Sequence, residues 1–283
     1  MKVTRTSGPF GMEVEKVQLA QLGRADLATL KELLFSVGLL IFRGQHDLTP
    51  TGQTEFALRW GEPNVNRFFQ QVEDFAHIAQ IRKEPHETVN VGEGWHTDHS
   101  YDLIPAMGSI LRAVVLPPAG LGDTLFVNTQ MAYSALDSTT RAEIADCRAH
   151  HSSRHIFGPD APTRSGTQGR VGNAQAAVQD VLHRVVIEHP VTGSPGLYVN
   201  PAFTRSIVGM GEPRSRLLLQ RLYSHCQSDR FVTCLSWQPG TVAMWDNRLT
   251  WHRAVNNYHG YSRLMHRITI AGEPLAGSRP LPS

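Results

Sequence analysis

The chain has 283 residues, of which 41% are hydrophobic and 18% charged, and its formal net charge is +2. A chain of this length can bury one sizeable core, so we expect one domain over residues 1–283. There is no block of like charges and no run of eighteen apolar residues, which argues against a nucleic-acid partner, a membrane-surface partner and a transmembrane helix. The first residues lack the apolar stretch of a signal peptide, so we expect a cytoplasmic protein.

The first sixty residues are expected to mix helices and strands. Leucines at positions 27, 30, 33 and 34 recur at helical spacing, and residues 38–43 are a short apolar run typical of a buried strand. Thr49 and Pro50 then predict a helix start, because threonine can cap a helix and proline fits its first position. Phe56, Ala57 and Trp60 continue that helical spacing.

From about residue 78 onward, short apolar or alternating runs dominate, and turn-forming glycine and proline residues separate them. The predicted strands cover residues 110–116, 124–127, 185–189, 197–200, 231–237, 241–245 and 264–270. Helices are predicted at residues 129–145 and 215–226. This pattern is typical of a mainly β protein with flanking helices, and it favours a double-stranded β-helix, or jelly roll.

Residues 158–181 are rich in Gly, Ala, Gln and Thr and show little apolar periodicity. We expect a long surface excursion there. Loops of this length in compact domains are often functional. A lid over the active site and an uninvolved surface loop both stay open.

The segment Trp95-His96-Thr97-Asp98 contains the motif on which the functional prediction depends. In a strand, His96 and Asp98 would point to the same face and could bind one metal ion together. The chain has 14 histidines, so such a pair arises easily by chance and needs independent support. The ordinary alternative for any one histidine is a hydrogen-bonded structural residue.

His252 is the candidate third ligand, since it follows a predicted strand that ends in the turn-forming Asp246-Asn247. Strands far apart in sequence can be neighbours in a jelly roll, so His252 can join His96 and Asp98. Two imidazoles and one carboxylate form the facial triad typical of non-haem iron(II). Zinc accepts the same ligands, so the ligands alone leave an iron oxygenase and a zinc hydrolase open.

Arg263 and Arg267 are the feature that discriminates between these two enzymes. Residues four apart share one face of a strand, so both guanidinium groups can line one pocket. Arginine is well suited to bidentate carboxylate recognition. The pair therefore predicts a site for anionic ligands, and the alternative is a solvated pair on an exposed strand.

These motifs, with others in the same order, resemble the taurine and 2,4-dichlorophenoxyacetate dioxygenase family of iron(II)/2-oxoglutarate-dependent enzymes. The likeness extends over nearly the whole chain. The matching segments are Phe10-Gly11-Met12-Glu13-Val14, Ile41-Phe42-Arg43-Gly44-Gln45, Trp60-Gly61-Glu62-Pro63, Trp95-His96-Thr97-Asp98, Gly122-Asp123-Thr124, His189-Pro190-Val191-Thr192-Gly193, Leu197-Tyr198-Val199-Asn200, Trp245-Asp246-Asn247-Arg248, His252-Arg253 and Met265-His266-Arg267.

The resemblance assigns expected roles to particular residues. His96, Asp98 and His252 would bind iron(II) and form the catalytic centre. Thr124 and Arg263 would bind the distal carboxylate of 2-oxoglutarate. Arg267 would contact the acidic group of the substrate, as the corresponding arginine does in characterised relatives.

Asn64, His99 and Tyr101 complete the predicted substrate-binding residues. Asn64 lies in the stretch Pro63-Asn64-Val65-Asn66, which corresponds to the segment where taurine-specific members carry a histidine that contacts the sulfonate, and this difference counts against taurine. His99 and Tyr101 follow the metal motif, and strand alternation would put both on the face opposite Asp98, at the rim of the pocket. Residues 154–158 resemble the corresponding segment of aryloxyalkanoate-cleaving members.

The resemblance implies a hydroxylase that uses dioxygen and converts 2-oxoglutarate to succinate. An aspartate at position 98 indicates hydroxylation, because related halogenases carry a small residue there. The substrate is expected to be a small carboxylate or sulfonate. If its target carbon bears an ether oxygen or a sulfonate, the product collapses and turnover appears as C–O or C–S cleavage. Aromatic carboxylates, secondary metabolites and amino-acid derivatives stay open.

A small-molecule substrate is the partner that the sequence predicts, and a homo-oligomer stays open because family members are often dimers or tetramers. The alternative function is a catalytically silent jelly-roll protein that binds a metal or ligand. Asp98, Thr124 and Arg263 argue against it, since a silent protein has no need of a cosubstrate anchor. A zinc hydrolase would lack an HExxH general base.

Overall fold

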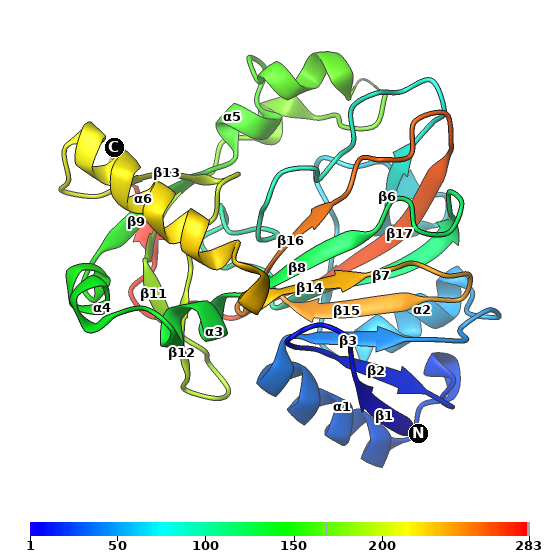
Figure 1. The fold of residues 1–283 in the computed structure, drawn as a ribbon. Coiled ribbons are helices and arrows are strands. Elements are labelled where there is room, and N and C mark those ends of the chain that lie inside the picture. Colours follow the sequence, from blue (N-terminus) through cyan, green and yellow to red (C-terminus); the bar gives the residue numbers. More distant parts are fainter. Residues whose placement is uncertain (168, 282–283) are drawn as a thin grey trace.

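A nine-stranded sheet forms the centre of the computed structural model, which describes residues 1–167 and 169–281 (Figure 1). Its order is β1-β2-β3-β15-β7-β17-β6-β5, with β4 paired to β17. The neighbours are antiparallel except β2 and β3. The bounds are β1 (Lys2–Arg5), β2 (Met12–Glu15), β3 (Leu39–Phe42), β4 (Pro63–Asn64), β5 (Gln71–Val72), β6 (Phe75–Lys83), β7 (Gly108–Val115), β15 (Val242–Asp246) and β17 (Arg263–Ile270).

Three smaller sheets accompany it. A three-stranded sheet has the order β14-β8-β16, a four-stranded sheet the order β13-β9-β10-β18, and β11 pairs with β12. Their bounds are β8 (Thr124–Asn128), β9 (Arg148–Ser152), β10 (Asp180–Arg184), β11 (Val186–Glu188), β12 (Pro195–Leu197), β13 (Thr204–Ile207), β14 (Val232–Leu235), β16 (Thr250–Ala254) and β18 (Arg279–Pro280).

The helices begin and end at residues with recognisable caps. Thr49 accepts a hydrogen bond from the backbone N of Gly52 at the start of α2, and Asp137 accepts one from Thr140 at the start of α4. Gly38 ends α1 with a φ of 80°, a conformation that glycine adopts without strain. The bounds are α1 (Arg24–Val37), α2 (Pro50–Leu58), α3 (Thr129–Ser134), α4 (Ser138–Ile144), α5 (Arg154–Phe157) and α6 (Glu212–Cys226), with 3-10 turns at Leu19–Gln21, Pro162–Gly166, Ala174–Ala176 and Asp229–Phe231.

The nine-stranded sheet buries both faces, because side chains alternate along each strand. One face packs with α1 and α2 and contributes Leu40, Phe42 and Met244 to a hydrophobic cluster. The other face contributes Leu39 and Trp245 to a cluster that the three-stranded sheet completes. The sequences of the central strands are therefore mostly apolar.

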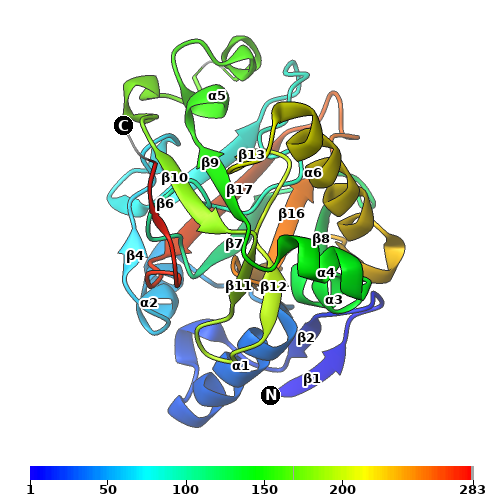
Figure 2. The same ribbon diagram turned by 90° about the vertical axis from the view of Figure 1, so that its left-hand side faces the viewer.

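The three-stranded sheet lies between this second cluster and a layer of helices. Phe126 of β8 packs toward the large sheet, whereas Val127 packs in a cluster with Trp251 and with leucines of α6. Figure 2 shows α3, α4 and α6 gathered beside β8 and β16, with α1 away from them below β2. This part of the molecule thus has four layers: helices, the nine-stranded sheet, the three-stranded sheet and a second set of helices.

The structure confirms most of the predicted elements and corrects some. The mainly β composition with flanking helices is confirmed. The helix predicted at residues 129–145 is two helices, because Asp137 caps a new start inside that range. The strand predicted at residues 197–200 lies earlier, at Pro195–Leu197. The excursion at 158–181 contains two 3-10 turns, and β10 already begins at Asp180.

Among the described residues, no helix has both the length and the apolar character needed to cross a membrane.

Candidate active site

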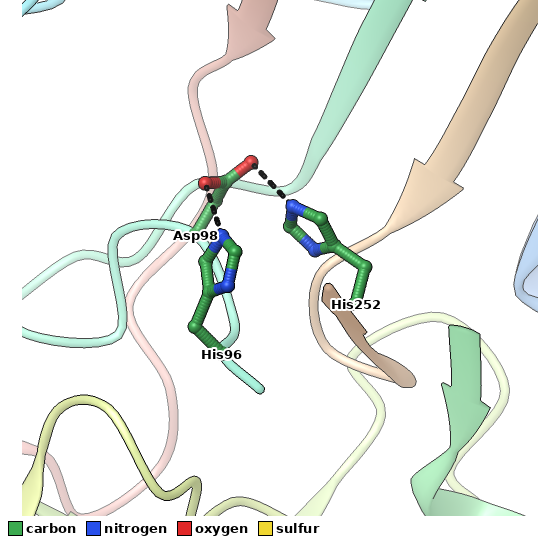
Figure 3. Close-up of side chains that lie close together, drawn as sticks. All are labelled: His96, Asp98 and His252. Carbon is green, nitrogen blue, oxygen red and sulfur yellow. Dashed lines mark ion pairs between the residues drawn. The ribbon is translucent and has the colours of Figure 1, made fainter. Parts of the chain in front are cut away.

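His96, Asp98 and His252 lie together, although they are far apart in sequence. One possible ligand atom from each lies within 4.8 Å of the others. The Nε2 atom of His96 is 3.8 Å from Asp98 Oδ1, and that of His252 is 3.9 Å from Asp98 Oδ2. Figure 3 shows the carboxylate directed toward both imidazole rings. All three residues are buried, so the group can enclose a single divalent ion.

The backbone explains why the two histidines meet. His96 and His252 form an isolated antiparallel bridge and exchange both backbone hydrogen bonds, at 3.1 and 2.8 Å. Residues directly opposite each other in such a pair project to the same side. Their ring centroids are 4.1 Å apart. A single local pairing between residue 96 and β16 therefore brings the two imidazoles to one point.

Both imidazoles are suited to metal binding. The Nδ1 atom of His96 donates to the carbonyl of Gly94 at 2.8 Å, which leaves Nε2 with the lone pair on the side of Asp98. Burial lowers the pKa of His96 and lowers that of His252 well below its ordinary value. A neutral imidazole is the form that binds a metal ion.

Asp98 is held as a carboxylate. Burial by itself would raise its pKa, but the Arg267 guanidinium acts in the opposite direction and the pKa of Asp98 is lowered. Arg267 Nη1 lies 2.9 Å from Oδ1, and the hydroxyl of Ser109 donates to Oδ2 at 2.7 Å. The triad thus combines two neutral nitrogen donors with one anionic oxygen donor, a set that suits iron(II) or zinc.

A cavity of about 490 Å³ opens in front of the triad. This volume is typical of a site for a small molecule. The large sheet contributes Ile81, Leu111, Trp245, Arg263 and Arg267 to its walls, and the small sheet contributes Thr124 and His252. The cavity therefore lies between the two sheets.

Arg263 provides a buried guanidinium with free donor atoms in this cavity. The residue is 3% exposed, and its Nε and Nη2 atoms have no hydrogen-bond partner within the described part of the chain. Burial lowers its pKa. Thr124 lines the same cavity, and because its Oγ1 already accepts from Trp237 Nε1 at 2.9 Å, its hydroxyl proton is available for an anion.

Aromatic rings line another part of the cavity. Phe69, Tyr101, Phe157 and Phe203 all contribute to the wall. Tyr101 and Phe203 meet edge to face with centroids 4.7 Å apart. The guanidinium of Arg267 lies 5.0 Å from the centroid of Phe69. An apolar body with an anionic group would match this combination.

His99 provides a polar group in the same wall, and its neighbours hold it in place. Its Nδ1 lies 2.8 Å from Asp102 Oδ2, and Arg67 Nη2 contacts both oxygens of Asp102 at 2.9 and 2.8 Å. Its Nε2 lies 3.5 Å from Asn66 Nδ2. The backbone of His99 is left-handed, with a φ of 59°, which histidine tolerates better than most residues.

The structure corrects two expectations about this region. Residues 98–100 form a turn, so the strand assumed for the metal motif is wrong. The face assignment that followed from it is also wrong, because Asp98, His99 and Tyr101 all line the cavity. Asn64 lies in β4 opposite Thr269 and is not among the described residues that line the cavity.

Several polar residues at the site were not predicted from the sequence. Asp102 and Arg67 support His99, and Tyr258 donates to Asn90, which lines the cavity, at 2.9 Å. The three-residue spacing of His99 and Asp102 was the available signal for that pair. Ser109 carried no signal, because a lone serine in an apolar strand has no motif.

Part of the 158–181 excursion contributes to the wall of the cavity. Thr167 and Val171 line it, and Val171 forms a β-bridge with Phe69. Arg170 is buried, and it donates to the carbonyls of Arg82 and Val89 at 3.1 and 2.9 Å. The excursion is thereby joined to the segment that precedes the metal motif.

Three comparisons with known proteins agree with one another. Residues 2–269 match the sequence model of the family described as "Taurine catabolism dioxygenase TauD, TfdA family". The chain is 31% identical to the alpha-ketoglutarate-dependent sulfate ester dioxygenase of Pseudomonas putida, covering 98% of this chain and 91% of that protein. It is 31% identical to the (S)-phenoxypropionate/alpha-ketoglutarate-dioxygenase of Delftia acidovorans, covering 97% and 96%.

A solved structure gives the same result for the fold. The crystal structure of AAD-2 in complex with Mn(II) and N-oxalylglycine superposes with a TM-score of 0.77 at 30% identity. The alignment covers 97% of this chain and 99% of that chain.

Proposed function

The chain belongs to the taurine catabolism dioxygenase TauD, TfdA family and is an iron(II)- and 2-oxoglutarate-dependent dioxygenase, and from this premise we propose that it hydroxylates a small anionic substrate at His96, Asp98 and His252. The observation that carries the proposal is the cluster of these side chains at the wall of a cavity that also contains Arg263 and Arg267. The family resemblance inferred from the motifs is thus confirmed. The roles of the individual residues are our proposal.

The residues present fit the iron centre and its cosubstrate. Two buried imidazoles with their Nε2 atoms near Asp98 and one buried carboxylate supply three ligands and leave other positions open. Iron(II), 2-oxoglutarate and dioxygen, when bound, supply the oxidising chemistry in which 2-oxoglutarate is converted to succinate and a C–H bond is hydroxylated. Arg263 and Thr124 would bind the distal carboxylate, because both have hydrogen-bond donors free to point into the cavity.

Arg267 would orient the anionic group of the substrate. It lines the cavity and lies against the ring of Phe69, so a carboxylate, sulfonate or sulfate can bind it while an apolar body contacts the aromatic wall. His99, held by Asp102, and Tyr101 would contribute polar contacts to the same substrate. The protein's task is to hold the target carbon beside the metal and to exclude water.

We also propose that residues 1–283 form one dioxygenase domain with a jelly-roll centre and a lid. The nine-stranded and three-stranded sheets enclose the cavity from two sides, which supports the jelly roll. Residues 167 and 171 line the cavity, which supports a lid at 158–181 over an uninvolved loop. The formal charge of +2 supports a small-molecule partner rather than nucleic acid.

The testing experiment is succinate formation by iron-loaded protein with 2-oxoglutarate and oxygen. The panel contains aryloxyalkanoates, alkyl sulfates, sulfonates including taurine, and N-acyl amino acids. We expect succinate to rise with anions that carry an apolar body and to stay at the uncoupled rate with taurine, because aromatic rings form part of the cavity wall and the stretch that contains Asn64 lacks the sulfonate-contacting histidine of taurine-specific members. Cleavage of a C–O or C–S bond would be seen as release of a phenol and an oxo acid from an aryloxyalkanoate, of inorganic sulfate and an aldehyde from an alkyl sulfate, or of sulfite and an aldehyde from a sulfonate.

Asp98→Ala is the matched negative variant. It removes the charged ligand while leaving Arg263 and the cavity wall in place, so 2-oxoglutarate recognition by the arginine is retained and turnover is lost. Wild-type turnover in this variant would contradict the assignment of the triad. Failure of the wild type to bind iron(II) or 2-oxoglutarate would favour the catalytically silent protein or the zinc hydrolase.

A further inference from the structure

We propose that Ser109 is a positioning residue for Asp98, at the end of a directed hydrogen-bond chain that begins at Trp245 and passes through Asn247. This inference rests on the proposed function in one respect, namely that Asp98 is a metal ligand. It goes beyond that function because it assigns roles to three residues outside the ligand set.

The direction of the chain follows from its donors. The indole Nε1 of Trp245 can only donate, and it donates to Asn247 Oδ1 at 2.9 Å. The amide of Asn247 is thereby fixed with its Nδ2 toward Ser109 Oγ, at 3.5 Å. Ser109 then uses its single proton to donate to Asp98 Oδ2 at 2.7 Å. Each link determines the orientation of the next, and every donor points toward the carboxylate.

Burial restricts the motion of the residues in this hydrogen-bond chain. Ser109 and Trp245 are 0% exposed, Asn247 1% and Asp98 5%. Ser109 lies on β7 directly between Trp245 of β15 and Thr269 of β17. A Cβ added at the preceding Gly108 would lie 2.5 Å from the Trp245 carbonyl oxygen, so the two strands approach closely there. The backbone N of Asn247 also donates to the carbonyl of Met107, at 2.9 Å.

The two oxygens of Asp98 have different kinds of partner. Oδ1 pairs with Arg267, which lines the cavity and can exchange this contact for a substrate anion. Oδ2 binds Ser109, which has no other role at the site. The ring of Trp245 also packs against His252, with centroids 4.5 Å apart. One indole therefore contacts one ligand directly and begins the chain that orients another.

The consequence is a carboxylate whose plane stays fixed when Arg267 turns to a substrate. Removing a hydrogen-bond partner of a metal ligand typically weakens metal affinity by about 10–100-fold. If Ser109 only provided a hydrogen bond to a buried oxygen, its replacement would lower the stability of the fold and leave metal affinity unchanged. The two roles can therefore be separated by measuring both quantities.

The test is anaerobic Mn(II) binding to the full-length metal-free protein, measured from the EPR signal of free Mn(II). Ser109→Ala should bind Mn(II) about 10–100-fold more weakly than wild type. Ser109→Cys keeps the shape with a weaker donor and should lie between them. The matched control is Ser153→Ala, because Ser153 is also 0% exposed and also donates at 2.7 Å, to Gln179 Oε1. It should bind Mn(II) within about twofold of wild type.

Two further readouts sharpen the result. The visible absorption of the Co(II)-loaded protein should shift in Ser109→Ala and stay unchanged in Ser153→Ala, since only the first variant frees the carboxylate. Thermal unfolding of the metal-free proteins reports the structural contribution of each serine. If Ser109→Ala does not fold, the Mn(II) affinities of wild type and Ser109→Cys are compared instead, and wild type should bind Mn(II) more tightly.

The outcomes distinguish the two proposals. Wild-type Mn(II) affinity in folded Ser109→Ala, or equal losses in Ser109→Ala and Ser153→Ala, would overturn the positioning role while leaving the metal site intact. Failure of the wild-type protein itself to bind Mn(II) would overturn the metal site and, with it, the role of Ser109.

Discussion

Replacing Arg263 by alanine should weaken the binding of 2-oxoglutarate specifically. Arg263 is 3% exposed, and two of its guanidinium nitrogens have no hydrogen-bond partner within the described residues, so these donors are available to a ligand. Loss of one member of a buried charge pair costs roughly 2–5 kcal/mol. At about 1.4 kcal/mol per tenfold, the dissociation constant should rise between about 30-fold and a few thousandfold.

Arg263→Lys separates charge from geometry at the same position. Lysine keeps the positive charge but loses the planar pair of donors, so one charge-assisted hydrogen bond, worth about 1.5–3 kcal/mol, is lost. We expect a rise in the 2-oxoglutarate dissociation constant of roughly tenfold to 150-fold, below that of the alanine variant.

The assay is 2-oxoglutarate binding to Mn(II)-loaded protein by calorimetry, together with the KM for 2-oxoglutarate from succinate formation. Arg112→Ala is the control, since Arg112 lies opposite His266 on the neighbouring strand and is not among the described residues that line the cavity. An unchanged KM in Arg263→Ala, or equal effects in the two variants, would refute the reasoning.

Three other outcomes are expected. Arg267→Ala should raise KM for anionic substrates at least ~30-fold, the lower bound for losing a buried charge partner, and an equal rise for neutral analogues would contradict its role. Burial lowers the pKa of His183 to about 4, whereas the unfolded chain binds the proton from about pH 6.5 downward. The free energy of unfolding should therefore fall by up to about 3 kcal/mol between pH 6.5 and 4. Urea titrations in which His183→Gln loses stability equally steeply over this range would disprove the assignment. Arg170→Ala removes its hydrogen bonds to the carbonyls of residues 82 and 89 and its ion pair with Glu87, so amide exchange at residues 169–172 should accelerate. Unchanged protection would show that Arg170 does not hold the excursion in place.

Local signals in the sequence predicted the elements whose boundaries depend on local chemistry. The cap at Thr49 and the proline after it marked the start of α2 because both act within one turn. The spacing of Arg263 and Arg267 predicted a shared face because alternation along β17 is also a local property. The split between α3 and α4 was missed, since the periodicity of residues 129–145 continues across the cap at Asp137.

Features that depend on pairing between distant segments could not be predicted. The segment that contains His96 and Asp98 does not form a strand, and His96 pairs with His252 through one isolated β-bridge rather than a continuous ladder. The prediction that these residues meet rested on the pairing of distant strands in a jelly roll and on the family resemblance, and neither of them specifies the isolated bridge. The contact of Ser109 with Asp98 depends on how a turn lies against β7. No spacing in the sequence encodes that distance.

Strand β17 sets the separation between the two cationic groups of the cavity. Arg263 pairs with Lys83 and Arg267 with Ala79 in the unbroken ladder to β6, so the two Cα atoms are separated by four strand residues, or roughly 13 Å. Inserting or deleting one residue between them would turn Arg267 to the opposite face of the sheet. This strand therefore fixes the distance between the cosubstrate and substrate sites. New substrate preferences can arise by changing side chains on the opposing wall while this distance stays constant.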